Sequence, residues 1–316
     1  MKLSNNILKN NFEKLIESNL DFEIKTKDLN SEPLLPQEIH LKINGKELQI
    51  LRKHEFQDNL RIQFFCDFLN RCLSVLNFEI SCEAIFNLSE GIEQNFSIKR
   101  FCYSKMKGLN HALIPDAHNF VTWQKINNLK NIDIDFRQKN NSAIFVGSDT
   151  GKLKNGFSCR SFFCKKFNEN KNIIAKLTGN VREEIKIALE EINFHDNFVE
   201  MRDQLKHRII LNIDGNSTSW ERPLWAMASN SICIYINPFH EFEFESWFYP
   251  MMDFLNIMPK VSIENFEYFF ENDFEDDFWQ EVNENQKIFG NFIGNLNSQV
   301  MYFSNLLHHY NKQYNE

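Results

Sequence analysis

The sequence predicts an α/β protein with parallel strands, on the basis of three stretches of the chain. Residues 207–236, HRIILNIDGNSTSWERPLWAMASNSICIYI, place two short apolar runs, 209–213 and 232–236, on either side of a glycine loop and a helix-like segment. Residues 142–167 repeat the order of strand, glycine loop and helix. The first hundred residues alternate helix-like stretches (6–20 and 60–76) with strand candidates (39–43 and 84–89). A strand, a helix and a second strand in succession build parallel sheets.

Length and composition indicate a globular chain of about two domains. The chain has 316 residues, of which 42% are hydrophobic and 25% charged. Its formal net charge of -8 argues against nucleic acid or an anionic membrane as a partner recognised by bulk charge. We therefore expect no nucleic-acid partner.

The N-terminus and the cysteines indicate a reducing compartment. Residues 1–15 lack the continuous apolar core of a secretory signal, and no run of about 18 apolar residues occurs. The seven cysteines are an odd number and form no CxxC pair, so we expect reduced thiols in structural positions rather than a zinc site. These features favour the cytoplasm.

The loop after residue 213 has the residues of an anion site. We expect a helix from about Trp220 to Ser229, with Thr218 or Ser219 as N-cap and Pro223 in the first turn. A helix start directs backbone N–H groups at an anion, and Arg222 there can add a bidentate contact to a diphosphate. An ordinary strand-to-helix turn with a surface arginine explains the spacing about equally well.

A second glycine loop follows the strand candidate at 143–147. The stretch GSDTGK does not fit a Walker motif, because only three residues separate the glycines and Leu153 follows Lys152. Ser148 and Arg160 remain candidates for phosphate or nucleotide contacts. Two such loops suggest one ligand held between the ends of neighbouring strands.

Three carboxylates invite a catalytic or metal-binding interpretation. Asp133 and Asp135 form an Asp-x-Asp pair, which either holds a divalent metal or lies on the solvent face of a short strand. The pair lies in a polar stretch, 126–141, which we interpret as the crossing between domains. Asp116 follows Pro115, near His111 and His118. It is either a general base or a turn residue that bonds its own backbone.

In order, the motifs resemble glycosyltransferase family 90, which includes protein O-glucosyl- and O-xylosyltransferases and bacterial enzymes that modify lipopolysaccharide or capsule. The resemblance covers about residues 113–314 and is most specific at 204–231, and the first hundred residues lie outside it. The segments that carry it are LIPDAHNF (113–120), AIFVGSDTG (143–151), residues 204–231, ESWFYPMM (245–252) and IENFEYFFEND (263–273).

The resemblance implies a GT-B architecture, in which two Rossmann-like domains face each other across a cleft. Residues 1–138 are then an acceptor-side α/β domain, with the C-terminal helix 290–316 packing back on it, and residues 139–289 bind the UDP-sugar donor. The implied reaction is an inverting, metal-independent transfer with no cofactor, in which a carboxylate deprotonates the acceptor hydroxyl. A charged arginine stabilises the leaving UDP in place of a metal.

The resemblance also assigns site residues. Asp116 is the implied catalytic base; the implied donor-binding residues are Gly147, Ser148, Arg160, Asp214, Gly215, Ser219, Trp220, Arg222 and Glu245, with Arg222 aligned after a one-residue shift. The chain departs from the animal members at Lys125, which stands where their catalytic Asp lies. The catalytic base is therefore Asp116 or another carboxylate, or the chemistry differs from that of the animal members.

We thus expect an enzyme that moves a glucose-like sugar from a UDP-sugar to a hydroxyl of a bacterial surface glycan, such as lipopolysaccharide core or capsule. The chain ends NKQYNE, without the ER-retention tail of the animal enzymes, which favours a bacterial-type cytoplasmic enzyme, with peripheral contact at the inner face of the membrane. Lys125 motivates the alternative, an inactive family member that binds a nucleotide or glycan.

Overall fold

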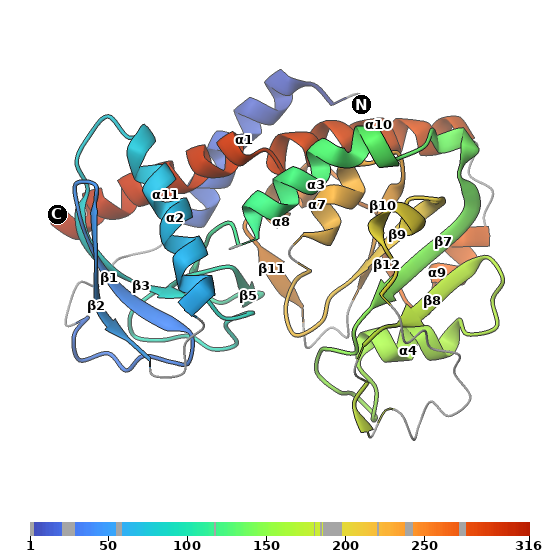
Figure 1. The fold of residues 1–316 in the computed structure, drawn as a ribbon, viewed down its shortest axis with the longest axis horizontal. Coiled ribbons are helices and arrows are strands. Elements are labelled where there is room, and N and C mark those ends of the chain that lie inside the picture. Colours follow the sequence, from blue (N-terminus) through green and yellow to red (C-terminus); the bar gives the residue numbers. More distant parts are fainter. Residues whose placement is uncertain are drawn as a thin grey trace. The chain divides into compact units, whose positions relative to one another are not determined.

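The computed structural model describes residues 3–20, 29–54, 59–116, 118–179, 181–183, 185, 198–219, 221–237, 243–271 and 276–316. The chain divides into two compact units, drawn in Figure 1. Unit 1 comprises Met1–Ser4, Thr122–Glu243 and Leu255–Gly294, and unit 2 comprises Asn5–Val121, Phe244–Phe254 and Asn295–Glu316. The division places residues 122–138 in unit 1, whereas the sequence suggested a boundary at 138, and it places 295–316 in unit 2.

Unit 1 contains a parallel sheet with the order β12-β10-β9-β7-β8. Its strands are β7 (Asn140–Gly147), β8 (Ile173–Leu177), β9 (His207–Ile213), β10 (Ile232–Asn237) and β12 (Lys260–Ser262). Numbered along the chain, the spatial order is 2-1-3-4-5, the order of doubly wound folds of the flavodoxin type. The order reverses between β7 and β9, which are direct neighbours. Ligands of such sheets bind beyond the carboxyl ends of the strands at this switch point.

Helices cover both faces of this sheet. Figure 1 shows α7 (Arg222–Ala228) and α10 (Asp276–Ile293) on one side and α4 (Cys159–Lys166) on the other. Phe163 of α4 and Phe167, which follows it, pack in the core with Phe266 of α9 (Phe266–Glu271). Ser158 caps α4 in a capping box, which satisfies N–H groups at the helix start. The short α6 (Met201–Gln204) precedes β9.

Unit 2 contains a mixed sheet with the order β2-β1-β3-β4-β6. Its strands are β1 (Glu38–Asn44), β2 (Glu47–Lys53), β3 (Ser81–Asn87), β4 (Phe101–Cys102) and β6 (Ala112–Leu113). β1 is antiparallel to β2 and β3, whereas β4 is parallel to β3 and β6. The two-stranded pair β5 (Ser104–Met106) and β11 (Phe244–Ser246) is separate. Because of its antiparallel strands, this sheet differs from the fully parallel sheet of unit 1.

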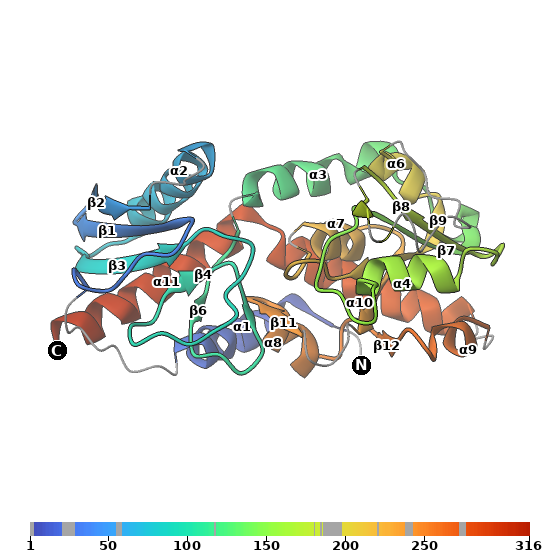
Figure 2. The same cartoon turned by 90° about the horizontal axis from the view of Figure 1, so that it is seen from below.

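The helices of unit 2 are α1 (Asn5–Leu20), α2 (Asn59–Val75), α8 (Tyr249–Phe254) and α11 (Leu296–Asn315), as Figure 2 shows from below. Aromatic rings join α2 and α11 to the sheet: Phe303 of α11 lies 5.8 Å from Phe68 and 6.4 Å from Phe86, centroid to centroid. Burial of several phenylalanines in one cluster supplies much of the hydrophobic stabilisation of this unit.

The predicted α/β class is confirmed, and so are the strands and helices expected on either side of the two glycine loops. The interpretation of residues 126–141 as the crossing between domains is wrong, because the whole stretch lies within unit 1. This stretch contains the end of α3 (Asn119–Ile132), a 3-10 helix (Phe136–Gln138) and the start of β7. The asparagines obscured the buried positions Ile126 and Leu129, which are one helical turn apart.

The two carboxylates of this stretch are not on a strand, as the simpler expectation had it. Asp133 follows α3, where its buried carboxylate accepts bonds from Lys139 and from the Asn230 N–H. Asp135 caps the 3-10 helix by accepting from the Arg137 N–H at 3.0 Å. Both side chains therefore have structural roles.

The expected start of the helix after β9 also shifts. Helix α7 runs from Arg222 to Ala228 with Glu221 at the N-cap, whereas Thr218 or Ser219 was expected there. Pro223 lies in the first turn, as expected.

All seven cysteines are free thiols, as expected. Burial raises the pKa of Cys82, Cys102 and Cys233 to about 12, so these thiols stay protonated at neutral pH. In the described parts of the chain, no helix has the length and apolar character needed to cross a bilayer.

Candidate functional site

The loops that follow β7 and β9 meet at the switch point of the unit 1 sheet. Ile144 pairs with Ile210, and each strand ends three residues later, so the two loops leave the sheet at the same level. The Gly151 N–H donates to Asn216 Oδ1 at 2.8 Å, which ties one loop to the other. Gly151 has φ +106°, and a Cβ there would lie 3.0 Å from the Gly215 carbonyl oxygen. Glycine is therefore required on both conformational and steric grounds.

Gly215 has no side chain, and the space that a side chain would occupy is filled by Thr150 and Arg160. A Cβ at this position would lie 2.2 Å from Thr150 Oγ1 and 2.9 Å from Arg160 Cζ. The absence of a side chain at Gly215 thus allows Arg160 to pass from α4 across the end of β9.

Arg160 links the two loops through four hydrogen bonds. Its Nε donates to the Ile213 carbonyl at 3.0 Å, and its Nη1 donates to the Ser148 carbonyl at 3.1 Å and to Thr150 Oγ1 at 2.7 Å. Its Nη2 lies 3.4 Å from Ser219 Oγ. The guanidinium is held mainly by neutral oxygen atoms at the carboxyl ends of β7 and β9.

Arg222 brings a second guanidinium to the same edge. It donates to the Val146 carbonyl, one residue before the end of β7. Its Cζ lies 5.2 Å from the centre of the Phe145 ring, and that of Arg160 lies 5.9 Å from the same ring. Burial, followed by the charge of Arg160, lowers the pKa of Arg222 to about 10, so it stays charged at neutral pH. Two neighbouring cations at a partly buried edge favour an anion as ligand.

Asp214 is the first residue after β9, at the start of the same loop. Its buried carboxylate accepts from the Tyr235 hydroxyl at 2.6 Å and from the Ser219 N–H at 3.0 Å. Burial raises the pKa of this carboxyl to about 6, against the lowering effect of both hydrogen bonds. Asp214 thus fixes the loop, and its charge changes near neutral pH.

Asp149 and Arg182 anchor the β7 loop, a contact that sequence reasoning missed. Arg182 Nε and Nη2 donate to the two carboxylate oxygens of Asp149, each at 3.0 Å, and Arg182 Nη1 donates to the Gly151 carbonyl at 2.9 Å. Ser158 Oγ also donates to Asp149 at 2.9 Å. The charge of Asp149 within the loop was the one sign of this contact in the sequence. Nothing in the spacing of the sequence indicated that its partner lies more than thirty residues away.

The structure brings together Gly147, Ser148, Arg160, Asp214, Gly215, Ser219 and Arg222 of the predicted donor residues. Trp220 lies outside the described residues. Glu245 lies on β11 in unit 2, where its carboxylate is 3.8 Å from Lys105 Nζ.

The predicted base, Asp116, also belongs to unit 2. It is buried, and its Oδ1 accepts from the His118 N–H at 2.7 Å, which is the local turn contact weighed above. The neighbouring His111 has its pKa lowered to about 4 by burial, so its ring is neutral at neutral pH.

Lys125, the position at which the chain departs from the resemblance described above, pairs with Glu221. Lys125 Nζ lies 2.5 Å from Glu221 Oε1, and the side chains are 35% and 36% exposed. The pair therefore joins α3 to the N-cap of α7, directly before Arg222.

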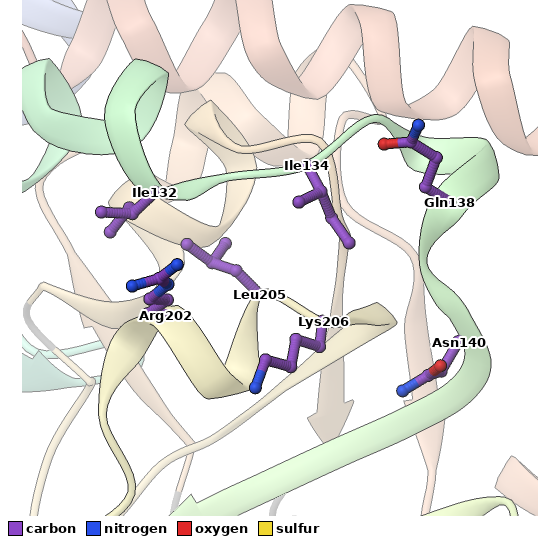
Figure 3. A pocket seen from close by; sticks show the side chains of 7 residues that line it. All are labelled: Ile132, Ile134, Gln138, Asn140, Arg202, Leu205 and Lys206. Atoms are coloured by element: carbon purple, nitrogen blue, oxygen red, sulfur yellow. The ribbon is translucent and has the colours of Figure 1, made fainter.

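A cavity lies at the opposite, amino-terminal edge of the sheet. Its volume is about 340 Å³, and it lies beside the starts of β7 and β9. Figure 3 shows Arg202 and Lys206 close to Leu205 among the side chains that line it. Its lining residues are Ile132, Ile134, Gln138, Asn140, Arg202, Leu205 and Lys206. None of them belongs to the glycine loops, so the cavity is separate from the arginine pair.

Neither a protein-family model nor a curated protein matches the chain.

Proposed function

We propose that the protein is an inverting, metal-independent glycosyltransferase of GT-B type that moves a glucose-like sugar from a UDP-sugar to a hydroxyl of a bacterial surface glycan. In this proposal unit 1 binds the donor and unit 2 receives the acceptor. The enzyme works in the cytoplasm, at the inner face of the membrane, on a glycan such as lipopolysaccharide core or capsule.

The observation that carries the proposal is the arginine pair at the switch point. Arg160 and Arg222 approach one ring, that of Phe145, from two helices, α4 and α7. Holding two guanidinium groups together costs free energy, and a diphosphate offsets this cost by accepting charge-assisted hydrogen bonds. The same charges stabilise UDP as it leaves, which is the task that a metal performs in other transferases.

The acceptor chemistry requires a base. We assign it to Asp116, whose carboxylate is buried in unit 2. An inverting transfer needs one carboxylate that removes the proton of the attacking hydroxyl as that hydroxyl displaces UDP. Asp116→Asn keeps the shape of the side chain and an acceptor for the His118 N–H, so it should abolish transfer while leaving UDP binding unchanged.

Calorimetric titration with UDP and several UDP-sugars, with and without EDTA, tests the donor site. We expect micromolar binding that EDTA does not change, and a loss of roughly tenfold or more in Arg222→Ala. Arg222→Lys should retain part of the affinity, because it keeps the charge but not the fork of donors. Arg202→Ala is the matched control, since it removes one arginine at the opposite edge of the sheet. A folded wild-type protein that binds none of these ligands would refute the donor site.

The Lys125–Glu221 pair favours one second candidate, a protein that binds a nucleotide or glycan without catalysis. A cation stands where the animal enzymes have their catalytic carboxylate, and its partner lies next to Arg222. Donor hydrolysis and sugar transfer distinguish the two candidates: UDP binding with neither activity supports the second one.

A further inference from the structure

Helix α2 of unit 2 presents a solvent-exposed stripe. Leu60, Phe64, Asp67, Arg71 and Val75 are all exposed, and their spacing of four, three, four and four residues places them on one face of the helix. The exposed fractions of Leu60, Phe64 and Val75 are 58%, 45% and 55%, which is unusual for apolar side chains grouped on one helix face. The buried residues Ile62, Phe65, Phe68, Leu69, Cys72 and Leu73 form its inner face.

The charges at the centre of the stripe have a self-complementary arrangement. Asp67 and Arg71 lie one helical turn apart, on either side of residue 69. A two-fold axis through that point would place each Asp67 opposite an Arg71 of a second, antiparallel copy. The same register sets Leu60 opposite Phe78, which is 41% exposed just beyond the helix, and Phe64 beside Val75.

We propose that α2 is the contact surface of a homodimer, in which it packs antiparallel against α2 of a second copy of the chain. A two-fold contact requires a surface that complements itself, and this stripe does so in both charge and apolar positions. Arg71 already lies 5.7 Å from the centre of the Phe120 ring, which holds its guanidinium at the stripe. Phe120 and Val121, 42% and 40% exposed, extend the apolar surface on that side.

A lipid surface fits the stripe less well than a second copy. Asp67 lies in the middle of the apolar residues, where an anionic membrane would repel it, and the chain carries a net charge of -8. Opposite a second copy, the same carboxylate gains one partner of opposite charge, Arg71 of that copy.

The expected dimer is weak. Helix α2 has 17 residues and is therefore about 26 Å long, so one helix pair buries less than the roughly 800 Å² per partner of a standard interface. We expect a dimer at a protein concentration of about 100 μM that dissociates on dilution to about 1 μM.

Sedimentation velocity of the full chain over this concentration range, combined with charge reversal, tests the proposal. Asp67→Arg and Arg71→Asp should each be monomeric at every concentration, because each places like charges opposite one another. A 1:1 mixture of the two variants should form the heterodimer, since all four charges are then paired. The double variant should also dimerise. Glu47→Arg, the same charge change on exposed β2 of the same unit, is the control and should dimerise like the wild type.

Three results would overturn the proposal. One is a monomeric wild type at about 100 μM, a concentration at which even low-end specific interfaces form. Another is a mixture of the variants that stays monomeric while the wild type dimerises, since another surface would then hold the dimer. The third is a monomeric wild type that floats with anionic vesicles and no longer floats after Phe64→Asp, which would assign the stripe to a lipid surface.

Discussion

Asp214→Asn should change how stability depends on pH. Burial raises the pKa of the Asp214 carboxyl from its ordinary value of 3.8 to about 6. The folded protein therefore binds this proton more tightly than the unfolded chain does. The stabilisation that results is fully present below the ordinary value, and it is lost as the pH rises through the folded value of about 6. At neutral pH the protein carries a buried charge, which asparagine would remove.

The difference between the two pKa values corresponds to about 3 kcal/mol at 1.36 kcal/mol for each tenfold change in proton affinity. Asparagine can still accept from the Ser219 N–H and donate to the Tyr235 oxygen, so most of the local structure should persist. We therefore expect the free energy of unfolding of Asp214→Asn, relative to the wild type, to rise by about 2–3 kcal/mol between about pH 4 and about pH 7.

Urea unfolding of both proteins at several pH values measures this relative change. The change with pH is independent of any effect of the substitution on the free energy of unfolding that is the same at every pH. Glu47→Gln, which removes an exposed carboxylate outside the proposed dimer contact, should give a nearly constant difference over the same range. A relative stability that falls with rising pH would refute the reasoning. It would mean that the charges of Arg160 and Lys260 stabilise the Asp214 carboxylate by more than burial costs.

Two glycine substitutions test the packing around the site. Gly215→Ala should weaken UDP binding at least about tenfold, measured by calorimetry, without unfolding the chain. The added Cβ would lie 2.9 Å from Arg160 Cζ and would displace the guanidinium. An unchanged affinity would contradict the role of Arg160 in binding. Gly290→Ala should lower the free energy of unfolding by about 1–3 kcal/mol, because its Cβ would lie 2.5 Å from the Ala228 backbone nitrogen, where α10 packs on α7. In urea unfolding the exposed Asn291→Ala on the same helix should differ little from the wild type, and an equal loss in both variants would show that backbone contact is not the cause.

The parts of the fold that could be predicted are those determined by local sequence. The apolar runs before Gly147 and Asp214 are β-branched, short and bounded by turn residues, which is the pattern of buried strands. Helix α3 was missed because its polar face is rich in asparagine, which resembles a loop in composition. Its buried positions are few, and their contacts with the rest of unit 1 cannot be seen in composition.

The candidate site depends on a pairing that no local pattern contains. Both glycine loops were predicted from the sequence, but Arg160 reaches the Ile213 carbonyl only because β7 and β9 are adjacent. The chain passes through β8 between them, and β8 lies on the far side of β7. If β8 lay between β7 and β9, the two loops would be one strand spacing, about 4.8 Å, farther apart. One arginine could then not donate hydrogen bonds to both loops. The position of β8 at the edge therefore brings two common strand-to-helix turns together, and the proposed anion site depends on this strand order.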